Sequence, residues 1–123
     1  MTEHLLTVDS LGREGVRDIL DLSHRFKREP GRHRQALAGG RLGMIFDKPS
    51  TRTRVSLEVA AVALGMHPIA LRPDELQLGH GETVADTARV LSRYLTALTI
   101  RTFAQARVDE LAANATIPII NAL

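Results

Sequence analysis

Residues 42–71 read LGMIFDKPSTRTRVSLEVAAVALGMHPIAL, and this stretch predicts a strand, a helix and a second strand. The apolar run at 42–47 is typical of a buried strand, and residues 51–64 carry apolar side chains at helical spacing. Gly65 is expected to end the helix, because glycine readily adopts the backbone conformation that follows a helix. Residues 67–71 form a second short apolar run. Strands that alternate with helices through short connections indicate a parallel sheet.

The same alternation continues to the end of the chain. Thr83 is placed to cap a helix that runs to about Tyr94, and a strand at 97–101 follows it. A further helix at 105–115 and a strand at 117–121 complete the pattern. The sequence therefore predicts an α/β fold, in which a four-stranded parallel sheet is covered by helices on both faces.

One more helix precedes the sheet. Ser10 is expected to cap a helix of residues 10–29, which the Pro30-Gly31 pair ends. Each helix of the chain should bury the side on which its apolar residues recur. These inward residues are Val16, Ile19, Leu20 and Phe26; Val55, Val59 and Val62; Val84, Ala88, Leu91 and Leu95; and Val108, Leu111, Ala112 and Ala115.

Composition excludes several classes of protein. The chain has 123 residues, the size of one domain with a buried core, and its lack of cysteine excludes a disulfide scaffold and thiol catalysis. A formal net charge of +2 and 3% aromatic residues argue against nucleic-acid binding. No apolar run reaches the ~18 residues of a membrane span, and the N-terminus lacks the features of a signal peptide. We therefore expect a cytoplasmic domain without a membrane partner.

Hydroxyl and guanidinium groups cluster after the first strand of the sheet. Ser50 and Thr51 stand at the N-terminus of the following helix, and Arg52, Thr53 and Arg54 continue its first turn. The free N–H groups at a helix N-terminus bind anions, and an arginine can hold a phosphate through two parallel hydrogen bonds. The sequence therefore predicts a phosphate-binding site. The alternative is an ordinary serine or threonine cap beside two solvated arginines.

Other chemistry-bearing residues are sparse. Arg101 ends the third strand, where it can supply a second cation at the same edge of the sheet or be a plain surface arginine. The loop 74–82 is neither a Walker loop nor a dinucleotide fingerprint. The five histidines lack ligand spacing, so we expect neither a metal nor a cofactor. Asp86 and Arg89 predict an exposed ion pair on their helix.

The stretch 46–58, FDKPSTRTRVSLE, resembles the carbamoyl-phosphate signature of the aspartate/ornithine transcarbamylase family. Similarity to the ornithine branch of that family is found at residues 78–83, 86–91 and 100–103 and at the ending, 117–123. The aspartate branch usually has lysine where His80 stands and histidine where Thr102 stands. His80 and Thr102 therefore favour the ornithine branch, and the resemblance runs from about Ser10 to the last residue.

The resemblance also implies which residues bind substrate. Carbamoyl phosphate would be held by Ser50, Thr51, Arg52, Thr53, Gln77 and Arg101. Arg52 would also face the carbamoyl oxygen, and Arg52 and Arg101 would be the catalytic residues. Gln77 would contact carbamoyl phosphate bound in a neighbouring subunit.

Members of the family are trimers whose protomers join a carbamoyl-phosphate domain to an ornithine-binding domain. Residues 1–123 resemble the first domain, and the chain stops two residues after Asn121, where a covering helix would normally follow. We interpret the chain as a single truncated domain of a two-domain enzyme. The C-terminal ornithine-binding domain would be absent, and the chain by itself would have little or no activity.

The expected reaction is attack of the ornithine amine on the carbamoyl carbon, giving citrulline and phosphate in arginine biosynthesis. Cations and helix amides would stabilise the charge that develops on the carbonyl oxygen and on the leaving phosphate. Glu82 would orient Arg52, or would only interact with the dipole of its own helix. Two alternatives remain: a transcarbamylase acting on aspartate, putrescine or an acylated ornithine, and an anion-binding module without catalysis.

Overall fold

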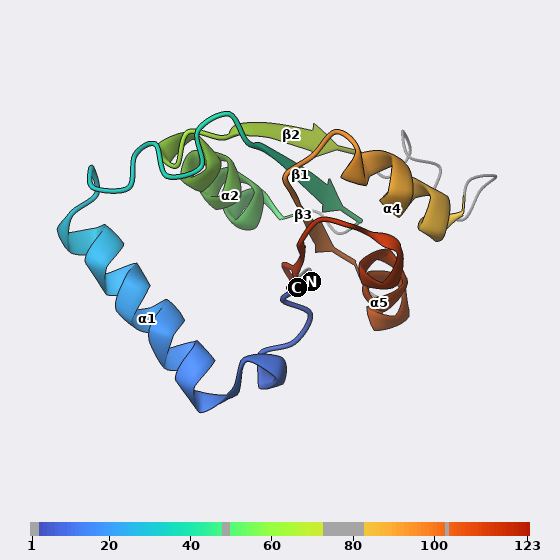
Figure 1. The fold of residues 1–123 in the computed structure, drawn as a ribbon, viewed down its shortest axis with the longest axis horizontal. Helices are drawn as coiled ribbons and strands as arrows, with labels where there is room; N and C mark the ends of the chain where they lie inside the picture. The colour runs from blue at the N-terminus through green and yellow to red at the C-terminus, as the bar shows by residue number, and fades with distance from the viewer. Residues whose placement is uncertain (1–2, 48–49, 73–82, 103) are drawn as a thin grey trace.

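The computed structural model describes residues 3–47, 50–72, 83–102 and 104–123. Its sheet has four strands in the order β2-β1-β3-β4, and every neighbouring pair is parallel (Figure 1). The strands are β1 (Arg41–Phe46), β2 (His67–Leu71), β3 (Ala97–Arg101) and β4 (Ile119–Asn121). The helices are α1 (Gly12–Arg28), α2 (Thr51–Ala63), α4 (Val84–Ser92) and α5 (Gln105–Asn114), and a 3-10 turn, η1, spans Asp9–Leu11. The predicted α/β class and parallel sheet are confirmed.

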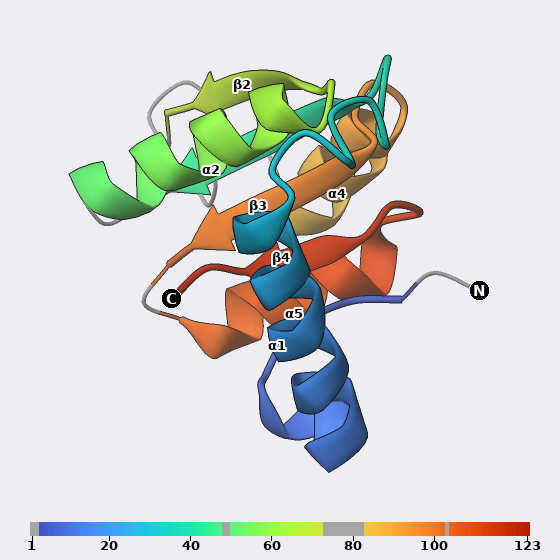
Figure 2. The same cartoon turned by 90° about the vertical axis from the view of Figure 1, so that its left-hand side faces the viewer.

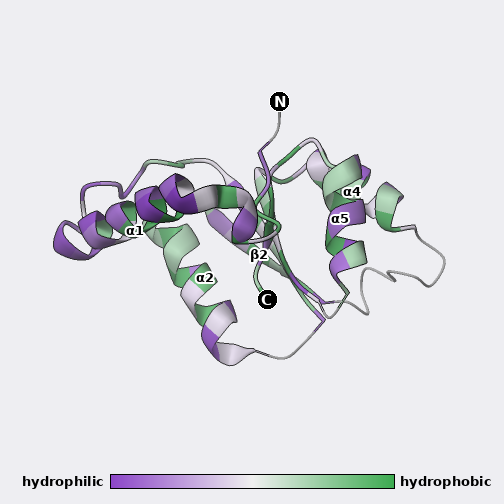
Figure 3. Cartoon of the chain, turned by 90° about the horizontal axis from the view of Figure 1, so that it is seen from below, coloured by the Kyte–Doolittle hydropathy of each residue, from purple (hydrophilic) through white to green (hydrophobic). Residues whose placement is uncertain are grey.

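Helices cover both faces of the sheet, as predicted. Helices α4 and α5 lie side by side on one face, and α2 lies on the other (Figures 1 and 3). The core on the α4/α5 face consists of Ile45, Ala88, Leu95, Leu98, Ile100, Val108, Leu111, Ala112, Ile117 and Ile119. The core on the α2 face is smaller and consists of Leu42, Met44, Ala61 and Met66. The inward residues predicted for α4 and α5 all belong to, or pack against, the first core.

The face that α2 buries differs from the prediction. Val55, Val59 and Val62 are 51%, 62% and 62% exposed, whereas Ala61 is buried and Leu57 packs beside it. The prediction for these valines is wrong because apolar residues occur on all sides of this helix, so the spacing of the valines does not select one buried face. The predicted end of the helix is confirmed. Gly65 has a φ of +88°, and the next N–H donates to the Ala61 carbonyl at 2.8 Å.

Helix α1 also departs from the prediction, because none of its residues is buried. Ile19 and Leu20 are 44% and 53% exposed. The helix packs against η1 and stands off from the sheet in Figure 1, while Figure 2 shows it extending past the strands. Ser10 does not cap it, because its hydroxyl donates to the Thr7 carbonyl inside the preceding turn at 2.7 Å. An amphipathic pattern shows that a face can be buried, but it does not place a partner against that face.

The N-terminal segment covers the outer edge of β4, which the sequence pattern did not indicate. Leu5 forms a parallel bridge with Ile120, and its N–H donates to the Ile119 carbonyl at 2.9 Å. The Asn121 N–H donates to the Leu5 carbonyl at 2.8 Å. Strand β4 begins two residues later than predicted.

Within the described residues, no helix is both long enough and apolar enough to cross a membrane.

Candidate functional site

The N-terminus of α2 begins directly beside the carboxyl ends of β1 and β3. Ser50 occupies the cap position with an extended backbone, and its carbonyl accepts the Arg54 N–H at 3.1 Å. Its side chain does not cap the helix, because the hydroxyl donates to Thr53 Oγ1 at 2.9 Å instead. The first turn of α2 also contains no acidic residue. Among the described residues, the first N–H groups of the helix are therefore left without a side-chain acceptor, and no carboxylate of that turn offsets the positive end of the dipole.

Arg101 reaches this helix terminus from β3. Its backbone pairs in register with Phe46 at the end of β1, and its Nη1 donates to Thr53 Oγ1 at 3.0 Å. The Nε of Arg101 is buried and has no hydrogen-bond partner among the described residues. Because Thr53 Oγ1 accepts from both Ser50 and Arg101, its own proton remains to be donated. The predicted meeting of the α2 terminus with Arg101 is confirmed.

The two arginines of the first turn of α2 have different surroundings. Arg54 Nε lies 3.2 Å from Glu58 Oε1 in an exposed pair along the helix. Arg52 is exposed, and no ion pair or hydrogen bond engages its side chain in the described part of the chain. Arg52 is therefore the guanidinium of this turn that can turn toward an anion without first breaking an ion pair. We call Ser50, Thr51, Arg52, Thr53 and Arg101 the anion site.

A second polar cluster, missed by the sequence analysis, lies at the same edge of the sheet. Asp47 follows β1, and its Oδ2 accepts a hydrogen bond from Thr102 Oγ1 at 2.6 Å and from Arg107 Nη1 at 2.6 Å. The Asp47 and Arg107 side chains are 14% and 32% exposed. The strand-end positions of Asp47 and Thr102 were a signal for this contact. Arg107 gave no such signal, because its role depends on how α5 packs.

Several predicted residues lie outside the described part of the chain. These are Gln77 and Glu82, together with Lys48, Pro49 and His80 of the motifs. The role of Gln77 in a neighbouring subunit and the contact between Glu82 and Arg52 therefore stay predictions. The predicted Thr83 cap is confirmed, because its side chain accepts the Asp86 N–H at 3.0 Å. The predicted exposed ion pair of Asp86 with Arg89 is also confirmed, because Arg89 Nη1 lies 3.0 Å from Asp86 Oδ1.

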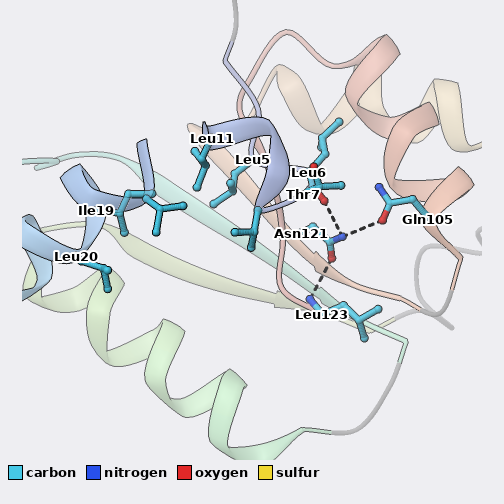
Figure 4. A pocket seen from close by; sticks show the side chains of 11 residues that line it. Leu5, Leu6, Thr7, Leu11, Ile19, Leu20, Gln105, Asn121 and Leu123 are labelled. Carbon is cyan, nitrogen blue, oxygen red and sulfur yellow. Dashed lines mark hydrogen bonds between the residues drawn. The ribbon is translucent and has the colours of Figure 1, made fainter. Parts of the chain in front are cut away.

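An apolar groove of about 440 Å³ lies between the N-terminal segment, α1 and the end of β4 (Figure 4). Leucine, valine and isoleucine side chains line most of it, and two amide side chains lie at one end. The Asn121 amide donates to the Leu6 carbonyl at 3.0 Å and to Gln105 Oε1 at 3.2 Å, so its N–H groups are already engaged. No residue of the anion site lines this groove. The lining of the groove is mainly apolar, so the groove is separate from the anion site and differs from it in chemistry.

Known proteins resemble this chain over nearly its whole length. It is 50% identical to an ornithine carbamoyltransferase of Parafrankia sp., covering 98% of this chain and 39% of that protein. An ornithine carbamoyltransferase of Bradyrhizobium diazoefficiens is 49% identical over 98% of this chain and 40% of its own length. The chain thus spans about 39% of the length of such relatives.

Solved structures share the fold. Ornithine carbamoyltransferase from Pyrococcus furiosus matches with a TM-score of 0.92 and 46% identity, over 98% of this chain and 39% of that one. The catalytic subunit of an aspartate transcarbamoylase from M. jannaschii matches with a TM-score of 0.86 and 30% identity, over 99% and 41%. The family described as aspartate/ornithine carbamoyltransferase, carbamoyl-P binding domain, matches residues 3–123, and the chain belongs to that family.

Proposed function

We propose that this chain binds carbamoyl phosphate at the anion site and serves a carbamoyltransferase that uses ornithine as the acceptor. The observation that carries the proposal is the meeting of an uncapped helix terminus with Arg101 at a single hydroxyl, Thr53 Oγ1. The first amide N–H groups of α2, the hydroxyls of Ser50 and Thr53 and the Arg101 guanidinium lie together there, and all of them can donate to phosphate oxygens. The match to a carbamoyl-phosphate-binding family supports this choice of anion.

Each group of the anion site has a distinct task in this proposal. The first-turn N–H groups of α2 and the hydroxyls of Ser50, Thr51 and Thr53 bind the phosphate. Arg52 binds the phosphate and faces the carbamoyl oxygen, and Arg101 binds from the side of β3. Gln77 reaches carbamoyl phosphate in a neighbouring subunit of a homotrimer. That assembly, a cytoplasmic location and a role in arginine biosynthesis belong to the same proposal.

The chemistry needs positioning and charge stabilisation above all. The ornithine amine attacks the carbamoyl carbon, a C–N bond forms, and the bond from carbon to the phosphate oxygen breaks. Negative charge grows on the carbonyl oxygen and on the departing phosphate. Fixed donors stabilise this charge more than that of the bound substrate, because they are already oriented when the charge develops. Holding the two reactants in line supplies much of the remaining acceleration.

Ornithine is favoured over aspartate as the acceptor by the relatives. The curated relatives cited above are named ornithine carbamoyltransferases, at 50% and 49% identity. The fold by itself does not separate the two acceptors, because the aspartate transcarbamoylase of M. jannaschii shares it. The acceptor would be bound by residues beyond this carbamoyl-phosphate domain. We therefore expect citrulline formation from the complete enzyme, and no turnover from residues 1–123 alone.

Calorimetry with phosphonoacetamide tests the proposal. In this probe a methylene group replaces the bridging oxygen of carbamoyl phosphate, so it cannot transfer the carbamoyl group. We expect it to bind the wild-type chain, and we expect Arg52→Ala to weaken binding roughly a hundredfold, because a charge-assisted contact is lost. Arg54→Ala is the matched control, because it removes an arginine from the same turn that is engaged by Glu58.

Arg54→Ala should change the affinity by no more than about twofold, as expected for an exposed ion pair on a helix surface. Equal affinities of wild type and Arg52→Ala would contradict the site. Equal losses in both variants would mean that general positive charge, and not the geometry of the anion site, attracts the probe.

A further inference from the structure

We propose that Asp47, Thr102 and Arg107 form a positioning cluster that holds Arg101 in place from the opposite face of the sheet. The inference rests on the proposed function, because it assigns a task to residues behind the anion site. None of the three is a substrate-binding residue in that proposal. Their contribution would be to fix where the Arg101 guanidinium lies relative to α2.

The alternation of side chains along the strands separates the two groups. Phe46 packs with the core on the α2 face, so the next residue, Asp47, points to the α4/α5 face. Ile100 belongs to the α4/α5 core, so Arg101 points to the α2 face. Arg107 on α5 contacts Asp47, and Thr53 on α2 contacts Arg101, which agrees with this assignment. The positioning cluster and the anion site are therefore on opposite faces of the same two strand ends.

Asp47 holds the end of β3 at two consecutive residues. Its N–H donates to the Arg101 carbonyl at 2.9 Å, and its Oδ2 accepts from Thr102 Oγ1 at 2.6 Å. Thr102 is only 3% exposed, so this hydroxyl has little access to water as an alternative partner. The backbone of Arg101 is thus fixed by one bond at its own carbonyl and by another at the side chain that follows. A shift of this backbone would move the guanidinium away from Thr53.

Arg107 supplies the charge that this arrangement requires. An uncompensated carboxylate at 14% exposure would be costly, and it would also repel an anion bound across the sheet. The Arg107 Nη1 lies 2.6 Å from Asp47 Oδ2 and offsets that negative charge. The same contact ties the first turns of α5 to β1. Removing Arg107 should therefore weaken anion binding by repulsion as well as by loosening the strand end.

The buried Nε of Arg101 provides a direct readout. It has no partner among the described residues, so its N–H resonance should respond to small movements of the side chain. In the ¹⁵N–¹H spectrum, Arg101→Lys identifies this resonance by its loss. A residue that only contributes to stability would lower the melting temperature without moving this signal or the affinity of the folded chain.

The test compares Thr102→Val with Thr102→Ser in the 123-residue chain. Thr102→Val removes the hydroxyl at nearly constant volume, and we expect it to shift the Arg101 Nε–H resonance and to weaken phosphonoacetamide binding about tenfold. Thr102→Ser retains the hydroxyl, so its Arg101 Nε–H resonance and its affinity for phosphonoacetamide should both match those of wild type. Arg107→Ala should weaken binding at least as much as Thr102→Val. Arg32→Ala removes an exposed ion pair elsewhere, with Glu29, and should change neither readout.

The outcomes separate this inference from the proposed function. If wild type binds the probe, and Thr102→Val changes neither the resonance nor the affinity, the positioning cluster is overturned while the anion site stands. If wild type does not bind, the proposed function fails for this chain. The Arg101 resonance in Thr102→Val and Thr102→Ser then still decides whether the cluster positions Arg101.

Discussion

The two faces of the sheet differ in what their residues do. On the α4/α5 face, ten buried residues of the described part of the chain form a continuous core, and Leu98, Ile100, Leu111 and Ile119 are completely inaccessible. On the α2 face, the described residues include four that are buried in the core, three valines of α2 stay exposed, and the N-terminus of α2 meets Arg101. The first face supplies most of the apolar burial, and the second presents the groups that can bind an anion. Stability and proposed function are therefore separable by substitution.

The largest effect should come from truncating the core of the α4/α5 face. Leu98 is completely buried, so Leu98→Ala removes apolar contacts and leaves a cavity. We expect a loss of about 3–4 kcal/mol in the free energy of unfolding, measured by urea denaturation. A loss below about 1 kcal/mol would mean that this face does not carry the core as described.

An intermediate effect is expected where the same core is tightly packed against a strand. Gly43 in β1 has no room for a side chain, because an added Cβ would overlap Leu95 Cδ1 and would lie 2.9 Å from Leu98 Cδ1. Gly43→Ala should therefore cost about 1–3 kcal/mol through overpacking. Urea denaturation again measures this change in the free energy of unfolding. A variant as stable as wild type would show that Leu95 can move aside without cost.

The smallest effect is expected on the outer side of α2. Val59 is 62% exposed, and Val59→Ser should change the free energy of unfolding of this chain by no more than about 0.5 kcal/mol. Its affinity for phosphonoacetamide should be unchanged, since Val59 lies two turns beyond the helix terminus. A loss as large as that of Leu98→Ala would remove the distinction between the two faces.

The sequence predicted most of the fold because local signals mark its boundaries. Gly65 ends α2 through its own positive φ, and Thr83 caps α4 by accepting the N–H of Asp86, three residues along the chain. Both boundaries therefore depend on neighbouring residues in the sequence. The faces of α4 and α5 were predictable, since their polar residues leave one apolar side. The buried face of α2 was not predictable, because the apolar residues of this helix occur on all of its sides. The exposure of α1 depends on packing partners that a local pattern does not specify.

The candidate site was predictable to the extent that it follows from sheet geometry. Parallel strands end at the same edge, so Arg101 could be placed beside the residues that follow β1. The contact of Arg107 with Asp47 could not be predicted, because it joins residues 60 positions apart through the packing of α5. The role of Gln77 remains a prediction from the resemblance, and the contact of Glu82 with Arg52 remains a prediction from charge and position, because both residues lie outside the described part of the chain.

The most direct test of the account is a titration of the ¹⁵N-labelled chain with phosphonoacetamide, followed by ¹⁵N–¹H spectra. The account predicts that the largest shifts occur at the first-turn amides of α2, residues 51–54, and at the Arg101 Nε–H. Amides of α1 and of the apolar groove, such as Leu6 and Ile19, should move little. Largest shifts in the groove, or around the exposed Arg89 of α4, would contradict the placement of the anion site on the α2 face.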